Sequence, residues 1–533
     1  MSKQTDAATA VATIPDGATV ASAGVIGWVT PDATLAALGR RFAETGAPRD
    51  LTFYFPCGTG DAMGIKGMDH VAREGLMKRI IAGSFINPVD PATGRRPEFM
   101  RLIRENRIEA WSWPIGASMH WLREVARRSP GYITRVGLGT YADPRHGGGK
   151  FTEKAAEDLI RLIEIDGEEL LYYPTWPIDV AIIRAASADP DGNLSWEDEP
   201  LITASIALAL AAKASGGRVI AQVRRMVEPG SRPSTAVRLP GVYVDQVVCD
   251  PDMMMTTDVA YEPAYFSGRR LPLSALSAPP FSVDRIIANR VSAEVRPGEL
   301  AIFGFGAATD VPLVMAETGR FDDGRLADYP ATTEHGAYGG IVMPGWQFSA
   351  NINPDALMDG LTQFDAIDGG LCRFAALSFA EFDAAGCVNV SRFGTACPGA
   401  GGFIDIAQNA RRIILAGTFT TAGLKAEVKD GRLTITTEGR VRKFVPAVQS
   451  ITYPLAQGVA DRGQAALIVT ERAVFRVLPE GLELIEIAPG IDLKRDILDL
   501  MDFAPIRIAD PLPMMDAAHF CARPAVDRKE TAS

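Results

Sequence analysis

Short apolar runs alternate with helical patterns along this chain, and the alternation is clearest near its N-terminus. Residues 18–23 form an apolar run that predicts a β-strand. The segment 30–32 (Thr-Pro-Asp) predicts a helix start with Thr30 as its N-cap, and apolar residues recur at helical spacing from Leu35 until Gly46. Residues 51–55 predict the next strand. Because strands that alternate with helices form parallel sheets covered on both faces, an α/β fold is expected.

The same alternation begins again in the second half. Residues 14–17, followed by an apolar strand, have a counterpart in residues 295–298, followed by the apolar run 300–303. Segments 189–192 and 383–386 are a second pair of landmarks, each followed by a helix and a strand. We therefore interpret the chain as two diverged, duplicated open α/β domains with mostly parallel sheets, the first with roughly ninety extra residues between the landmarks. Two unrelated α/β domains are the alternative.

The expected domain boundary lies at residues 267–282, which contain prolines but few large apolar residues apart from leucines. A chain of 533 residues exceeds what one hydrophobic core supports. We therefore expect an N-terminal domain at 1–275 and a C-terminal domain at 281–520, the latter bearing the catalytic residue discussed below.

Further elements are predicted inside both halves. In the first half, they are a helix from Thr152, strands at 169–173 and 179–186, a helix at 202–215 and a strand at 218–223. In the second half, they are a helix at 404–410 and a strand at 413–416. Residues 424–487 then alternate with a period of two, which predicts a β-rich C-terminal cap, and residues 492–501 predict a last helix.

Composition excludes several kinds of function. With 54 basic and 65 acidic residues the net charge is −11 and no basic run occurs, which disfavours nucleic acid and anionic membranes as partners. The six cysteines lack C-x-x-C spacing and no histidine pair has metal-ligand spacing, so neither a disulfide framework nor a metal site is expected. No export signal or long apolar segment is evident, and a cytoplasmic location is expected.

Two glycine-rich stretches resemble known loops without the context that those loops need. Residues 58–64 lack the spacing of a dinucleotide-binding fingerprint, so a plain turn is preferred. Residues 146–150 (His-Gly-Gly-Gly-Lys) have no G-x-S-x-G partner and are interpreted as a flexible loop that could border a substrate. His70 and His120 lie in apolar helical contexts and are expected to be core or interface histidines.

A single carboxylate among small residues is the main candidate for catalysis. Glu334 lies within 333–340 (Thr-Glu-His-Gly-Ala-Tyr-Gly-Gly), which predicts a tight turn, although a solvated loop acid would look alike. About sixty residues later, a glycine loop at 398–403 (Pro-Gly-Ala-Gly-Gly-Phe) runs into a predicted helix. A glutamate can attack an activated acyl carbon when backbone N–H groups meet the developing oxyanion. Gly399, Gly401 and Gly402 could supply such groups, or could form only a tight turn.

The region from Glu334 to Gly394, together with the glycine loop, resembles the class I coenzyme A transferases. Residues 334–336 (Glu-His-Gly) match the E-x-G nucleophile motif of that family, and residues 399–403 match its G-x-G-x-F loop. The likeness to the single-chain acetate/propionate type covers nearly the whole sequence. It implies a ping-pong transfer of CoA from an acyl-CoA to a carboxylic acid, in which Glu334 passes through anhydride and CoA-thioester forms.

The resemblance also implies substrates, further contacts and assembly. Acyl-CoA and small carboxylates would be the substrates, with no permanently bound cofactor, in a homodimer or homotetramer. Gly304 and Gly306 would contact CoA through their backbone, although a sharp strand end needs the same glycines. Phe403 would complete the glycine loop.

One stretch departs from the family pattern. Where the family has Pro-Gln-Gly, with a glutamine that binds the oxyanion, this chain has Pro114, Ile115 and Gly116. Either another donor substitutes, or the acyl pocket has become more apolar, or transfer is slow. His335, where the family has small polar residues, either lines the pocket and tunes Glu334 or is a bystander. For the protein as a whole, the alternatives to a CoA-transferase are a thioester hydrolase and a non-catalytic CoA-binding homologue.

The tryptophans near that stretch leave two interpretations open. Trp111, Trp113 and Trp121 would favour a larger or apolar acyl group if they lined the pocket. Packing in the core would explain them equally well.

Overall fold

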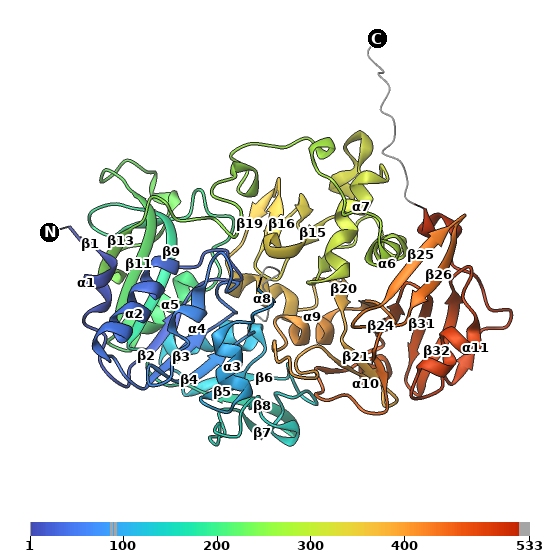
Figure 1. Ribbon diagram of the computed structural model, residues 1–533. Coiled ribbons are helices and arrows are strands. Elements are labelled where there is room, and N and C mark those ends of the chain that lie inside the picture. Colours follow the sequence, from blue (N-terminus) through green and yellow to red (C-terminus); the bar gives the residue numbers. More distant parts are fainter. Residues whose placement is uncertain (1, 86–88, 90–92, 522–533) are drawn as a thin grey trace, which may run out of the picture.

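A computed structural model of the chain describes residues 2–85, 89 and 93–521. Each half of the chain builds one large β-sheet, and the two halves lie side by side, the first in blue to green and the second in yellow to red (Figure 1). One buried apolar cluster contains residues of both halves, among them Trp113 and Phe364. The two sheets therefore share a core.

The first sheet is parallel along its main path, as the alternation of strands and helices predicts. Its strands, in spatial order, are β1 (Gln4–Thr5), β13 (Gln246–Cys249), β11 (Arg218–Met226), β9 (Val180–Ala188), β2 (Thr19–Ser22), β3 (Leu51–Phe55), β4 (Met77–Ala82) and β5 (Glu109–Ser112). The helices of this half are α1 (Ala7–Val11), α2 (Asp32–Thr45), α3 (Glu98–Arg104), α4 (Ile115–Arg127) and α5 (Ser205–Ala214). An antiparallel sheet of β6 (Gly131–Thr134), β8 (Glu168–Pro174) and β7 (Arg161–Ile165) projects from it.

The second sheet has a parallel centre and mostly antiparallel flanks. Its strands, in spatial order, are β19 (Ala356–Leu357), β16 (Ala337–Tyr338), β15 (Ala331–Thr332), β14 (Ala301–Phe303), β20 (Phe374–Ser378), β23 (Arg412–Ala416), β30 (Ala465–Val469), β31 (Ala473–Leu478), β32 (Gly481–Ile487) and β33 (Arg507–Ile508). The helices of this half are α6 (Val283–Ser292), α7 (Val311–Glu317), α8 (Gly360–Asp368), α9 (Phe403–Asn409), α10 (Leu455–Arg462) and α11 (Leu493–Asp496). None of the helices in the described residues is long and apolar enough to cross a membrane.

Strand order is the same in the central parts of the two sheets. The parallel path β3, β2, β9, β11, β13 of the first half corresponds to β15, β14, β20, β23, β30 of the second. The paired landmarks near β2 and β14, and near β9 and β20, align the same strands. This is the arrangement that a duplicated unit would give.

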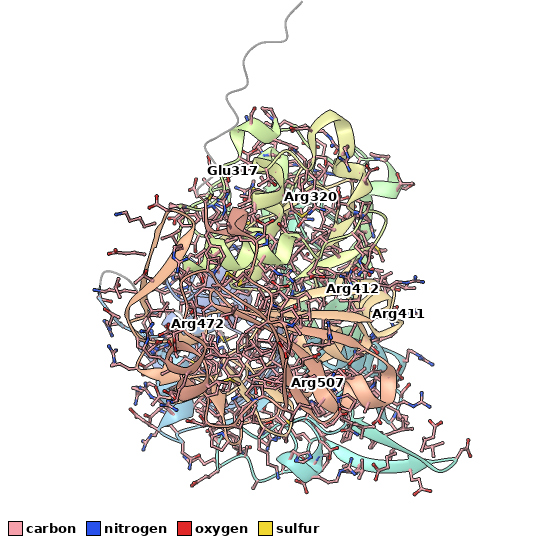
Figure 2. All side chains as sticks on the ribbon, turned by 90° about the vertical axis from the view of Figure 1, so that its right-hand side faces the viewer. Glu317, Arg320, Arg411, Arg412, Arg472 and Arg507 are labelled. Carbon is pink, nitrogen blue, oxygen red and sulfur yellow. The ribbon has the colours of Figure 1, made fainter. Side chains whose placement is uncertain are left out.

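The period-two region of residues 424–487 is strand-rich, as predicted, and it divides into two parts. A hairpin of β25 (Lys425–Lys429) and β26 (Arg432–Thr437) stands apart, whereas β30 to β32 extend the main sheet. The two parts are joined by Arg472, a fully buried residue labelled in Figure 2. Its guanidinium donates to Glu471 at 2.6 Å and to Glu438 at 2.8 Å.

Removing Arg472 is expected to destabilise the second half. Arg472→Met leaves the buried Glu471 carboxylate without its ion-pair partner, and such a change costs about 3–5 kcal/mol of unfolding free energy. Arg476→Met, four residues later on β31, is the control, because the Arg476 side chain is 52% exposed and should contribute below ~1 kcal/mol. Urea unfolding of both variants measures the difference; equal losses would contradict the interpretation of Arg472 as the joining residue.

The starts of two helices, α2 and α5, differ from the prediction. The α2 helix begins at Asp32 without a Thr30 side-chain cap; Gln222 on β11 instead accepts the Thr34 N–H at 3.1 Å. Helix α5 begins at Ser205 rather than at 202, since Thr203 has a φ of 53°.

The predicted last helix is longer than the helix in the structure, and the helix predicted from Thr152 does not form. Helix α11 ends at Asp496, whose carbonyl accepts a hydrogen bond from Arg472. No helix follows Thr152: residues 152–158 form turns and bends, and the Thr152 hydroxyl accepts the Ala110 N–H of β5 at 2.9 Å. Side-chain contacts to remote strands thus override local helical patterns.

Candidate active site

Glu334 lies at the carboxyl end of β15, in the turn that leads to β16. The turn closes through a 3.2 Å bond from the Gly336 N–H to the Thr333 carbonyl, and Gly336 has a φ of 90°, which favours glycine. The Glu334 side chain is only 14% exposed. The acid is therefore a partly enclosed turn residue rather than a solvated loop acid.

The backbone around Glu334 is fixed by Gln363, a buried residue of α8 to which the sequence analysis gave no role. Its amide donates to the Thr333 carbonyl at 2.8 Å, and its oxygen accepts from the Tyr338 hydroxyl at 2.6 Å. The Thr333 hydroxyl adds a 2.8 Å bond to the Ser349 carbonyl. Two of these bonds end on backbone carbonyls and the third orients the Gln363 amide, so none of them uses the Glu334 carboxylate.

The glycine loop is held from the first half of the chain. The Ala400 N–H donates to the Tyr141 hydroxyl at 3.2 Å, and the Gly401 N–H donates to the Gly83 carbonyl at 3.1 Å. The Ile115 N–H donates to the Gly401 carbonyl at 3.3 Å. This loop runs directly into α9, as the sequence predicts, and lies where the two halves meet.

Gly402 brings the loop against the nucleophile candidate. A Cβ at residue 402 would overlap Oε2 of Glu334, so only glycine leaves room for the carboxylate. Within the described residues, no acceptor pairs with the Gly402 N–H. The Gly399 and Gly401 N–H groups, in contrast, donate to the Ser391 and Gly83 carbonyls. Of the three predicted glycine donors, Gly402 is thus the one left free beside Glu334.

Gly304 and Gly306 lie at the same sheet edge as Glu334. β14 pairs with β15 in parallel, with Ile302 opposite Thr332, so the register places Gly304 beside the Glu334 turn. A Cβ at Gly306 would overlap the Ser378 hydroxyl at the end of β20. In the sheet, β15 lies on one side of β14 and β20 lies on the other. The carboxyl end of β14 is therefore a topological switch point, and open α/β sheets bind ligands at such points.

Ile115 and Gly116 begin α4 and contact the glycine loop from the other side. The Ile115 side chain is apolar, fully buried and close to Gly83, so it offers no side-chain donor and lines no open pocket. A Cβ at Gly116 would overlap the carboxylate of Asp405 in α9. Phe403, at the start of α9, is 7% exposed and belongs to the shared core.

Asp405 is a buried acid that the sequence analysis missed. It is fully buried, and neither carboxylate oxygen has a hydrogen-bond partner in the described residues. Burial, and secondarily the Asp368 charge, raise the pKa of Asp405 well above its ordinary value. The surroundings thus favour the neutral acid.

Asp405→Asn is expected to stabilise the protein at neutral pH. The folded state holds the Asp405 proton to higher pH than the unfolded chain, so the free energy of unfolding falls as pH rises above the unfolded pKa near 3.8. Asparagine removes this titration and should add about 1–3 kcal/mol at pH 7–8. The gain should shrink toward pH 4, because the unfolded Asp405 becomes increasingly protonated as the pH approaches its pKa.

Chemical denaturation at both pH values measures this difference. Asp430→Asn, in the exposed turn of the β25–β26 hairpin, is the control and should keep the wild-type pH dependence. A gain for Asp405→Asn that is the same at pH 4 and pH 8 would show that titration is not its cause.

The remaining histidines and the tryptophans have separate positions. His335 is fully buried, with Nε2 3.6 Å from Oε1 of Glu334. His120 is an interface histidine, since its ring nitrogens face Asp365 and Asp368 of the second half at 3.6 and 3.5 Å. Trp111, Trp113 and Trp121 are fully buried in the core, so they are packing residues and not an open acyl pocket.

Known proteins resemble this chain over nearly its full length. The family model for coenzyme A transferase matches residues 4–250. Acetate CoA-transferase YdiF of Escherichia coli K12 is 39% identical over 96% of this chain and 94% of that protein. Caffeate CoA-transferase of Acetobacterium woodii is 38% identical over 98% of each chain. This chain belongs to the coenzyme A transferase family.

Solved structures agree with the family assignment. The YdiF apoenzyme of E. coli O157:H7 superimposes with a TM-score of 0.89 at 37% identity, covering 98% of this chain and 97% of that one. The same E. coli protein as a thioester complex with CoA gives a TM-score of 0.88 at 36% identity, over 98% and 96% of the chains. The predicted α/β fold and CoA-transferase activity are thereby confirmed.

Some residues of the candidate site could not be found from local patterns. Tyr141 and Gln363 act on backbone far away in the sequence, and although Gln363 lies in the stretch that resembles the family, its pattern assigns no contact to it. Cys57, after β3, is buried, and burial together with the nearby Glu334 carboxylate raises the pKa of its thiol. Asp405 had one available signal, a charged residue in the first turn after a glycine loop.

Proposed function

We propose that this CoA-transferase works by a ping-pong mechanism with Glu334 as the nucleophile. A carboxylate oxygen of Glu334 attacks the thioester carbonyl of an acyl-CoA and expels CoA thiolate, which leaves an acyl-glutamyl anhydride. The thiolate then attacks Cδ of Glu334 and releases the first carboxylate, which leaves a glutamyl-CoA thioester. An incoming carboxylate collects CoA by the reverse steps.

The observation that carries this proposal is the contact between Glu334 and Gly402. The Glu334 side chain is 14% exposed, and its carboxylate accepts no hydrogen bond from the described residues. The N–H of neighbouring Gly402 has no acceptor among these residues either. An unpaired carboxylate at a mostly enclosed site is a competent nucleophile, and fixed N–H donors stabilise the oxyanion that its attack creates. The thioester complex with CoA known for YdiF of E. coli O157:H7 supports the same chemistry here.

We further propose that CoA approaches along the edge where Gly304 and Gly306 follow β14. This edge is shared with Glu334, and glycines let backbone N–H groups come close to a ligand. The relatives named for acetate and caffeate suggest that acyl-CoA thioesters of carboxylic acids are donors and carboxylates are acceptors. A screen of acetate against aromatic acids such as caffeate would rank the acceptors.

Chemical trapping tests the mechanism. Incubation with acyl-CoA followed by hydroxylamine or borohydride should modify the protein at Glu334, as mapped by peptide mass spectrometry. Labelling at another residue would contradict the assignment. Release of free CoA thiol without an acceptor acid would indicate a hydrolase, and CoA binding without exchange of labelled acetate, across several acyl donors, would indicate a non-catalytic homologue.

We also propose that the chain divides into domains at 1–275 and 281–520 and that it forms a homodimer or homotetramer. Residues 267–282 form a connection between β13 and α6 with only a short 3₁₀ turn, at residues 273–275, which agrees with a boundary there. Limited proteolysis would locate the boundary, and sedimentation analysis would measure the oligomeric state.

A further inference from the structure

His335 combines three properties that rarely occur together. Its side chain is fully buried, both ring nitrogens lack a hydrogen-bond partner in the described residues, and it directly follows Glu334. A buried polar group without a partner costs stability, so its presence calls for an explanation. The Glu334 carboxylate lies beside the ring, with Oε1 3.6 Å from Nε2.

The two oxygens of Glu334 face different groups. Oε2 lies against Gly402, whose N–H is unspent, and Oε1 faces Nε2 of His335. A separation of 3.6 Å is too long for a hydrogen bond in the resting enzyme, but hydrogen bonds in active sites commonly shorten when the reacting groups are engaged. Ile115, which begins α4, cannot provide a side-chain donor here, because it is apolar and buried.

Resting on the mechanism proposed above, we propose that His335 is a catalytic residue that stabilises the negative charge formed on Oε1 of Glu334 itself. When CoA thiolate adds to Cδ of the glutamyl anhydride, the C–S bond forms and the carbonyl electrons move to Oε1. The Nε2–H of His335 donates to this oxyanion. Collapse re-forms the carbonyl at Oε1, breaks the bond from Cδ to Oε2 and releases the acyl carboxylate.

This role requires no net proton transfer. The thiolate enters, a carboxylate leaves, and His335 keeps its proton throughout. The same donor serves the later step in which a carboxylate attacks the glutamyl-CoA thioester, since Oε1 again carries the charge. His335 is therefore assigned to the intermediates centred on Cδ of Glu334, in both halves of the cycle.

Two substitutions at residue 335 separate this role from packing. His335→Leu fills a similar volume without a donor, whereas His335→Gln can place an amide N–H near the position of Nε2. Rapid-quench measurement of glutamyl-CoA formation from acyl-CoA should show a loss of about 10²–10³-fold for leucine. Glutamine should recover the rate to within about tenfold of wild type. KM for acyl-CoA should change little in either variant.

Stability provides the second measurement. His335→Leu removes an unpaired buried polar group, so its Tm should equal or exceed that of the wild type while its rate falls. Equal losses in the leucine and glutamine variants, or a wild-type rate for leucine, would overturn the assignment. Absence of a Glu334 adduct in the wild type would instead overturn the ping-pong mechanism, so the two failures are distinguishable.

Discussion

Glu334→Gln is expected to lower CoA transfer by about 10⁴-fold or more, because the amide cannot act as a nucleophile toward the acyl carbon. Glutamine keeps the size of the side chain. Since the Glu334 carboxylate accepts no hydrogen bond in the described residues, its loss should leave the Tm almost unchanged. Steady-state transfer from acetyl-CoA to a carboxylate, with deamidation of residue 334 excluded by mass, measures the effect.

Glu480→Gln, on an exposed turn between β31 and β32, is the control and should transfer CoA at the wild-type rate. A Glu334→Gln enzyme that retains more than about 1% of wild-type transfer would argue that another group carries the acyl unit.

Gly402→Ala is expected to lower transfer by at least about 10²–10³-fold while the protein still folds. The backbone of Gly402 has a φ of −82°, which alanine adopts without strain. The added Cβ would overlap Oε2 of Glu334 and must displace the carboxylate from its present position. A misplacement of about 1 Å in a nucleophile is enough to cost ~10²-fold.

Gly216→Ala is the matched control for a glycine substitution. It lies after α5 with no atom within 4 Å of the new Cβ, and its φ of 81° should cost about 1–2 kcal/mol of stability. Transfer by Gly216→Ala should match the wild type. If Gly402→Ala kept transfer within tenfold of wild type, the close contact between loop and nucleophile would have no catalytic meaning.

Asp405 and His335 are two polar residues of the candidate site that lower the stability of the fold. Each is fully buried without a hydrogen-bond partner in the described residues, one beneath the glycine loop and the other beside the nucleophile. Unpaired polar groups lower stability, so substitutions that remove them should stabilise the fold. Their contacts differ: His335 faces Oε1 of Glu334, the oxygen that the proposed mechanism makes reactive, whereas the Asp405 carboxylate lies against Gly116 at the start of α4.

The sequence by itself determined the elements and the chemistry of single segments. Periodicity predicted β2, α2, β3, β9, β11, α9 and β23 to within about three residues at each end, because the spacing of apolar residues records which face of an element is buried. The turn at Glu334 and the glycine loop were equally visible, since glycine allows backbone conformations that other residues avoid.

Only the tertiary structure decided which of these segments meet. Tyr141 and Gln363 support backbone that is remote in sequence, and Gln222 and Arg472 set the ends of helices that local pattern placed differently. Whether a donor such as the Gly402 N–H has a hydrogen-bond partner depends on the acceptors that the whole fold brings within about 3 Å of it. A one-dimensional pattern contains no such distances, so the free donors around Glu334 emerge only when both halves are packed together.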